Sequence, residues 1–236
     1  NENSCVTDLL TNALPYTLHL AVGAMIIWLV VGIGLGLLAA KFRGKFPDTA
    51  GSVFVLLGTS LPTFVTGIAM IIWISIKWEI IPPSLEGYVS PLEDFHGYFN
   101  YYILAWITLA IAYAAFYTRF TRASILETAG EDYIRTARSK GASNASVNYD
   151  HALRNALLPV VTIIGIEAAF LVGGLIVTET VFNIPGVARF LVEAIRWRDY
   201  PIVQNLVMLI AFVVVMVNFL VDMAYMVLDP RIKFGD

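Results

Sequence analysis

One acidic residue, Glu167, lies inside a long apolar run of the sequence over residues 160–177. Because an ionised carboxylate is costly in an apolar environment, an acid at such a position has a functional role or a bonding partner. Glu167 could line a path for a cationic group, bond to a neighbouring helix, or remain protonated as a structural hydrogen-bonding group. In the last apolar run, Asn218 and Asp222 are expected to hold helices together.

The sequence lacks the glycine-rich loop with which many ATPases bind phosphate. That loop has the pattern G-x4-G-K-[ST], whereas the one Gly-Lys pair, Gly44-Lys45, is followed by Phe46 and has no upstream glycine at the required spacing. The lone cysteine, Cys5, excludes a disulfide framework and a multi-cysteine metal site. We therefore expect no catalytic residue, no bound cofactor and no metal site on this chain.

A basic, helix-forming segment follows the third apolar run. Apolar side chains recur at three- and four-residue spacing, which predicts a helix over 124–140. Arg138 lies in its last turn, and Gly141 supplies the left-handed residue expected just after a helix. Ser143 is a good N-cap for a second helix running towards Pro159. From charge alone, this pair could instead be solvated helices resting near anionic lipid.

The composition of the chain indicates a membrane protein. Of its 236 residues, 58% are hydrophobic and 14% are charged, against about 45–50% and about 25% in soluble domains. The mean hydropathy is +0.74, and a soluble globule of this size could not bury so much apolar surface. The formal net charge of −3 argues against a broad basic surface for nucleic acid.

Five apolar runs are long enough to cross about 30 Å of hydrocarbon as helices. They lack the alternation of barrel strands, so we predict an all-α integral membrane fold. The predicted spans are residues 17–40, 52–76, 101–117, 160–177 and 206–228. Pro62 is expected to break the second span near mid-membrane, although such a break can be a harmless kink. Gly32 and Gly36 have the GxxxG spacing that favours close helix packing.

Lysine and arginine are distributed unequally along the chain. Eleven of the fifteen fall on one side of the predicted membrane, and the side richer in these residues is cytoplasmic. The loop 118–159 and the C-terminus are therefore predicted to be cytoplasmic, and residues 1–16, 77–100 and 178–205 external. Because Asn1 lies outside without a signal peptide before it, we expect a sixth, N-terminal helix in the complete protein.

Three stretches of the sequence carry a resemblance to a known family. The stretch 132–159 contains the pattern A-x3-G-x9-H-x-L-x-N at Ala137, Gly141, His151, Leu153 and Asn155. It resembles the ATPase-docking loop of binding-protein-dependent ABC importer permeases and, more narrowly, of the oligopeptide/dipeptide/nickel permease family. The stretch 179–204 is similar to the outer loop of that family, and 218–236 to its C-terminus.

The resemblance implies a type I ABC importer permease-like fold in a single permease domain, 1–236, in the prokaryotic plasma (inner) membrane. It identifies the chain as the first of two paired permeases that import peptides or similar small solutes. The implied partners are a second homologous permease, two cytoplasmic ATPase subunits carrying ATP and Mg, and an external substrate-binding protein. The implied ATPase-coupling residues are Tyr133, Arg135, Thr136, Ala137, Arg138, Lys140, Gly141 and Ser143.

Two further groups of residues follow from the same reading. Pro62 and Glu167 would line the substrate pathway, where Glu167 could meet a peptide ammonium. The external loop would contact the binding protein, or would form a helix on the membrane surface. Its candidate contact residues are Phe182, Pro185, Gly186, Arg189 and Trp197.

Two other classes of function remain as alternatives. An ion-coupled secondary transporter would use Glu167 and Asp222 as a proton relay. A structural membrane scaffold would transport nothing. The glycine-hinged cytoplasmic loop argues against the secondary transporter, because such a carrier needs no lever at that position.

Overall fold

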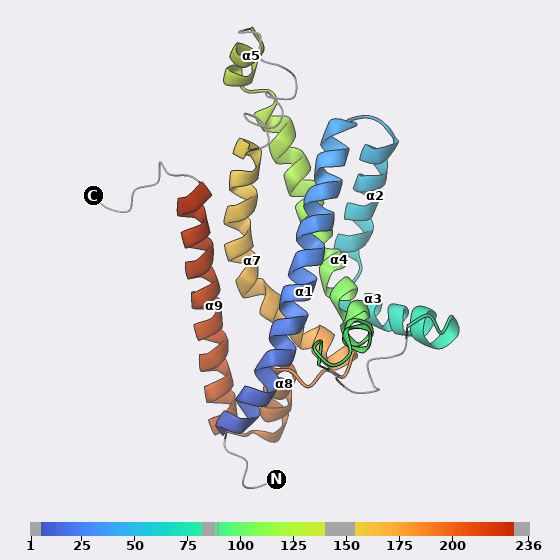
Figure 1. The fold of residues 1–236 in the computed structure, drawn as a ribbon, viewed down its shortest axis with the longest axis vertical. Helices are drawn as coiled ribbons and strands as arrows, with labels where there is room; N and C mark the ends of the chain where they lie inside the picture. The colour runs from blue at the N-terminus through green and yellow to red at the C-terminus, as the bar shows by residue number, and fades with distance from the viewer. Residues whose placement is uncertain (1–5, 82–87, 89, 140–153, 229–236) are drawn as a thin grey trace, which may run out of the picture. The chain divides into compact units, whose positions relative to one another are not determined.

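The computed structural model describes residues 6–81, 88, 90–139 and 154–228, which are mostly helical and contain no strand (Figure 1). The predicted all-α fold is therefore confirmed. The helices in chain order are α1 (Val6–Lys41), α2 (Phe46–Ser60), α3 (Thr63–Met70), the π-helix η1 (Ile71–Lys77), α4 (Phe95–Thr128), α5 (Asp132–Ser139), α7 (Arg154–Val181), α8 (Val187–Trp197) and α9 (Tyr200–Leu228).

Each predicted span falls on helical structure. Among the described residues, three helical segments are long and apolar enough to cross a membrane: Thr11–Lys41, Phe95–Thr128 and Tyr200–Leu220. The pair formed by Phe46–Ser60 and Thr63–Lys77 is a fourth, interrupted candidate. The remaining predicted span, 160–177, lies within the 28 residues of α7, whose side chains are described only in part.

The second predicted span is broken at the position of its proline. Helix α2 ends at Ser60, and Pro62 adopts an extended conformation, with φ −60° and ψ 139°, at the start of α3. Proline has no N–H to continue the hydrogen bonds of α2, and it disfavours the helical conformation in Leu61 before it. The Pro62 carbonyl instead accepts the N–H of Val65 at 3.0 Å and so begins α3.

The chain forms two compact units. The first comprises Asn1–Trp28, Ser60–Ala112 and Phe170–Val213, and the second Leu29–Thr59, Tyr113–Ala169 and Val214–Asp236. In the first unit, α8 packs against the beginnings of α1 and α9 (Figure 1). The buried residues of this core are Ala13, Val187, Leu191, Ala194 and Leu206. The loop predicted to be external, 178–205, thus contains a helix packed within the first unit.

In the second unit, glycines let α1 approach α4 closely. A Cβ placed on Gly32 would lie 2.6 Å from the Cβ of Tyr117, and one on Gly36 would lie 2.7 Å from the Cβ of Thr121. A Cβ on Gly34, between them, would meet nothing within 4 Å. Contacts under 3 Å leave no room for a side chain, so the predicted packing role of Gly32 and Gly36 is confirmed.

The single helix predicted over 124–140 is wrong. Helix α4 continues to Thr128, and a turn over residues 129–131 separates it from α5. In this turn the N–H of Gly130 donates to the Glu127 carbonyl at 2.9 Å, and that of Glu131 to the Thr128 carbonyl at 3.2 Å. These three-residue bonds satisfy the end of α4 without extending it as an α-helix.

Candidate functional site

The predicted coupling segment is represented by α5, in the second unit. Ile134 is 1% exposed and anchors the helix, whereas Tyr133 is 41% exposed and Thr136 is also exposed. The Thr136 hydroxyl donates to the Asp132 carbonyl at 2.9 Å. α5 is therefore amphipathic, with Ile134 buried and Tyr133 and Thr136 on its exposed side. The other predicted residues lie outside the described residues or have side chains outside the description: Arg135, Ala137, Arg138, Lys140, Gly141 and Ser143.

An ion pair holds the base of this segment in the second unit. Arg122, near the end of α4, donates from Nε to Oδ1 of Asp48 at 2.6 Å and from Nη2 to Oδ2 at 2.9 Å. Asp48 is buried in the first turn of α2, and its Oδ2 also accepts the N–H of Gly44 at 2.9 Å. A carboxylate at a helix N-terminus is favoured by the helix dipole, and two parallel bonds fix the guanidinium in one orientation.

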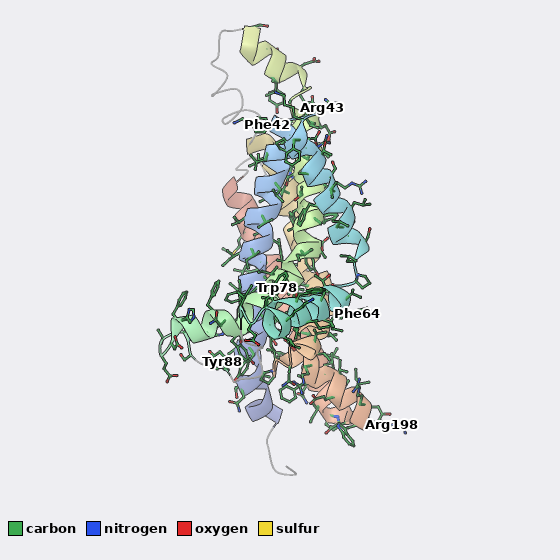
Figure 2. All side chains as sticks on the ribbon, turned by 90° about the vertical axis from the view of Figure 1, so that its right-hand side faces the viewer. Phe42, Arg43, Phe64, Trp78, Tyr88 and Arg198 are labelled. Atoms are coloured by element: carbon green, nitrogen blue, oxygen red, sulfur yellow. The ribbon has the colours of Figure 1, made fainter. Side chains whose placement is uncertain are left out.

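This ion pair ties three parts of the second unit together: the turn after α1, the start of α2 and the last turns of α4. The turn contains Phe42 and Arg43, both labelled in Figure 2. From the sequence, Arg122 was used only as one of the basic residues that predict the orientation of the spans. The signal that could have revealed the pair is Asp48 itself, because an acid in a first helical turn at the edge of an apolar run requires a partner.

The two predicted pathway residues belong to different units. Pro62 is exposed in the first unit, at the break before α3. Glu167 is partly exposed in the second, where it interacts electrostatically with the hydroxyls of Tyr113 and Tyr117 on α4. Among the residues described, the buried Tyr117 hydroxyl has no hydrogen-bond partner. The side chain of Asp222, the other acid of the predicted proton relay, is outside the description.

The external-loop residues differ in their accessibility. Phe182 is 3% exposed and Gly186 is buried within this chain. Pro185 and Arg189 are partly exposed. Trp197 is 84% exposed, beside Arg198 at the end of α8 (Figure 2). The most exposed of these predicted contact residues is therefore Trp197, in the last turn of α8.

A buried acid, Glu179, lies at the start of this loop, and no pattern in the sequence predicted a role for it. It is 0% exposed and lies two residues beyond the predicted span 160–177. It accepts the Thr17 hydroxyl at 2.6 Å and the Arg189 N–H at 2.8 Å. Burial raises the pKa of Glu179 to about 7, because removing a carboxylate from water outweighs these hydrogen bonds and the nearby Arg189 charge.

The sequence matches, over residues 32–234, the family described as "Binding-protein-dependent transport system inner membrane component". The chain belongs to this family of importer permeases. Family membership establishes a membrane-spanning permease of a binding-protein-dependent transport system, as the helical spans require.

Relatives of this permease agree with the match. It is 44% identical to a probable peptide ABC transporter permease of Sinorhizobium fredii, over 97% of this chain and 72% of the relative. It is 43% identical to the dipeptide transport permease of Escherichia coli, over 92% and 70%. A glutathione transport permease of Shigella boydii is 37% identical, over 97% and 72%. These relatives give no support to an ion-coupled carrier.

Solved structures support the permease fold. An amino acid ABC transporter matches with a TM-score of 0.70 at 17% identity, over 93% of this chain and 94% of that chain. An inward-facing methionine ABC transporter matches with a TM-score of 0.69 at 19% identity, over 94% and 97%. At this level of identity the likeness concerns the fold, and it confirms the predicted importer permease-like architecture.

Proposed function

We propose that this permease is a non-catalytic subunit of an ATP-driven importer that moves peptides or similar small solutes into the cell. The observation that carries the substrate class is the 44% identity to a peptide permease across 97% of the chain. The dipeptide and glutathione permeases at 43% and 37% identity point to the same class of solute. All three solutes are small and carry amino and carboxyl groups.

In the proposed importer, the two candidate pathway residues, Glu167 and Pro62, each have a role. Glu167 provides a carboxylate that could meet the ammonium of a peptide, and partly buried surroundings strengthen such an interaction. The chain is not helical at Leu61 and Pro62, between α2 and α3. Irregular backbone at membrane depth is tolerated where it lines a cavity or is covered by protein, which supports a place for Pro62 at the pathway.

Coupling to ATP hydrolysis is assigned to the segment that follows α4. Tyr133 and Thr136 present the accessible face of α5, and the remaining docking residues continue through Gly141 to Ser143. The Asp48–Arg122 pair holds the preceding helix by two bonds. Closure of the ATPases against α5 would then move α4 as a unit, because packed helices shift as rigid elements.

We propose the following partners for the permease and the following orientation in the membrane. The permease pairs with a second homologous permease, and two cytoplasmic ATPase subunits hold ATP and Mg. An external binding protein delivers the solute to the loop containing Pro185, Arg189 and Trp197. The excess of lysine and arginine on one side supports a cytoplasmic C-terminus in the prokaryotic inner membrane.

The composition of the complex tests this proposal. The tagged permease, gently solubilised and purified, is expected to carry a sister permease and two copies of ATPase subunits, identified by mass spectrometry. The preparation should hydrolyse ATP, and a Walker-lysine substitution in the co-purified ATPase should abolish that activity. A permease that purifies without ATPase subunits, yet still moves solute in vesicles, would contradict the proposal.

A further inference from the structure

Three basic residues gather at the turn that joins α1 to α2 in the second unit. Lys41 ends α1, and Arg43 and Lys45 follow it before α2 begins at Phe46. All three basic side chains are exposed. The chain reverses at Gly44, whose φ of +74° is one that glycine adopts readily. The turn therefore presents three cations at the end of a helix that is long and apolar enough to span a membrane.

The positive charge of this turn is only partly neutralised. Within the part of the chain that the structure describes, none of the three cations forms an ion pair with a carboxylate. The nearby carboxylate of Asp48 interacts electrostatically with Arg43. Both of its oxygens are already bonded, to the Arg122 guanidinium and to the N–H of Gly44. One carboxylate thus serves two arginines, and an excess of positive charge remains at the turn.

An exposed apolar stripe of α2 begins at the same turn. Its first residue, Phe46, is 83% exposed. Further exposed apolar residues recur along α2 at the spacing of one helical face. They are Val53, Leu56 and Leu57. The buried side of α2 contains Gly51, which lies against Ala39 of α1. α2 thus has one face packed within the second unit and one apolar face that the described part of this unit leaves uncovered.

We propose that the turn binds the phosphate of an anionic phospholipid, whose acyl chains lie along the exposed face of α2. We call Lys41, Arg43 and Lys45 the basic turn. Lysine and arginine bind phosphate through charge-assisted hydrogen bonds, and basic residues beside a membrane span attract anionic lipid. An apolar stripe that starts at these cations fits a ligand with an anionic head and a hydrocarbon tail. The proposed orientation places this lipid in the cytoplasmic leaflet.

The apolar stripe favours a lipid over two other occupants. Inorganic phosphate has the same oxygen chemistry, but it would bind the cations alone and leave Phe46 uncovered. A neighbouring permease could cover the stripe, but it would have to place an acid beside the bilayer for the cations, and carboxylates are costly there. An anionic phospholipid provides both the charge and the apolar surface in one molecule.

Photocrosslinking tests the site on the complete permease, purified with its subunits and placed in phosphatidylcholine nanodiscs. Two probes carry the same photoreactive group in an acyl chain, one on phosphatidylglycerol and the other on phosphatidylcholine. The measured quantity is the ratio of their labelling yields over residues 46–57, located by mass spectrometry. Each basic residue near an anionic surface strengthens binding about fivefold, so wild type should favour phosphatidylglycerol by more than about tenfold. A ratio near one would overturn the inference.

A pair of matched variants tests whether the basic turn causes this preference. Arg43→Gln/Lys45→Gln should lower the ratio by about tenfold, while labelling by phosphatidylcholine persists because the apolar stripe is unchanged. Arg196→Gln/Arg198→Gln removes two exposed cations at another turn and should keep the wild-type ratio. An equal ratio in the two variants would contradict the site. Should the first variant fail to fold, the wild-type ratio still decides.

Two further measurements separate the lipid from the other occupants. Excess inorganic phosphate, compared with chloride at equal ionic strength, should leave phosphatidylglycerol labelling unchanged, and a loss of labelling would assign the turn to free phosphate instead. Labelling of residues 46–57 by neither probe would mean that protein covers α2, and would also overturn the lipid site. Because both leaflets of a nanodisc contain the probe, the result depends neither on the proposed orientation nor on the proposed import of solute.

Discussion

At the residue scale, the closest contacts in the second unit are made by glycines. Gly32 and Gly36 lie one helical turn apart on α1. At each of them the backbone lies so close to α4 that an added Cβ would clash with it. In a membrane, where lipid is as apolar as leucine, such close approach provides the packing that holds helices together. The sequence alone indicated this role, because the spacing of small residues is local.

Adding one methyl group at Gly36 should therefore destabilise the permease. The new Cβ would lie 2.7 Å from the Cβ of Thr121 and 2.9 Å from the Thr118 carbonyl oxygen. We expect Gly36→Ala to lower the free energy of unfolding by about 1–3 kcal/mol, measured by denaturation in detergent. Gly34→Ala is the matched control, because its Cβ meets nothing within 4 Å. Equal stability of the two variants would contradict this packing.

The Asp48–Arg122 pair gives a second residue-scale prediction. Arg122→Gln should leave Asp48 without its cation, loosen the end of α4, and lower the uptake per ATP hydrolysed several-fold. Arg122→Lys, which keeps the charge but not two parallel bonds, should fall between Arg122→Gln and wild type. Arg119→Gln, an exposed change on the same helix, is the control. Uptake per ATP that is unchanged in Arg122→Gln would refute a coupling role.

The residue-scale features that the sequence did not reveal depend on distant partners. Glu179 bonds Thr17 across 162 positions, and Arg122 bonds Asp48 across 74. No local spacing encodes such pairs, because they form only when helices from different parts of the chain are brought together. The acids themselves were visible in the sequence, but their partners were not.

At the element scale, the turn between α4 and α5 is the main departure from the sequence prediction. The apolar period continues through residues 124–140, so it resembled one helix. Gly130 and the two tight bonds of residues 129–131 divide it. The break at Pro62, in contrast, was predictable, because proline removes a hydrogen-bond donor wherever it lies in a helix.

Making this turn helical should uncouple the permease. In Gly130→Ala/Glu131→Ala, alanine favours helix by up to about 1 kcal/mol at Gly130, so α5 would rotate away from its present orientation. We expect uptake to fall about tenfold, since a misoriented α5 transmits little of the ATPase motion, while ATP hydrolysis persists. Both rates are measured in proteoliposomes.

The double alanine variant has a matched control, and one outcome would contradict the role of the turn. Glu127→Gln keeps the backbone carbonyl that the turn uses and should transport as wild type. Uptake at the wild-type rate in the double alanine variant, with circular dichroism showing added helix, would mean that the turn does not orient the coupling segment.

At the scale of the whole molecule, the apolar runs and the basic asymmetry were sufficient to predict the class of protein. The apolar runs predicted membrane-spanning helices, because in hydrocarbon only helices and closed barrels satisfy the hydrogen bonds of the backbone. The residues that select a solute could not be derived in this way, because in the proposed importer the pathway would be formed together with a second permease.

The central claim is that ATP hydrolysis on partner subunits drives solute import through this permease. The direct measurement is uptake of a labelled dipeptide into proteoliposomes that contain the purified complex, with the binding protein outside and ATP inside. We predict uptake that requires both ATP and the binding protein and is unchanged by a protonophore. Uptake that persists without ATP, follows an imposed proton gradient and collapses with the protonophore would contradict the account.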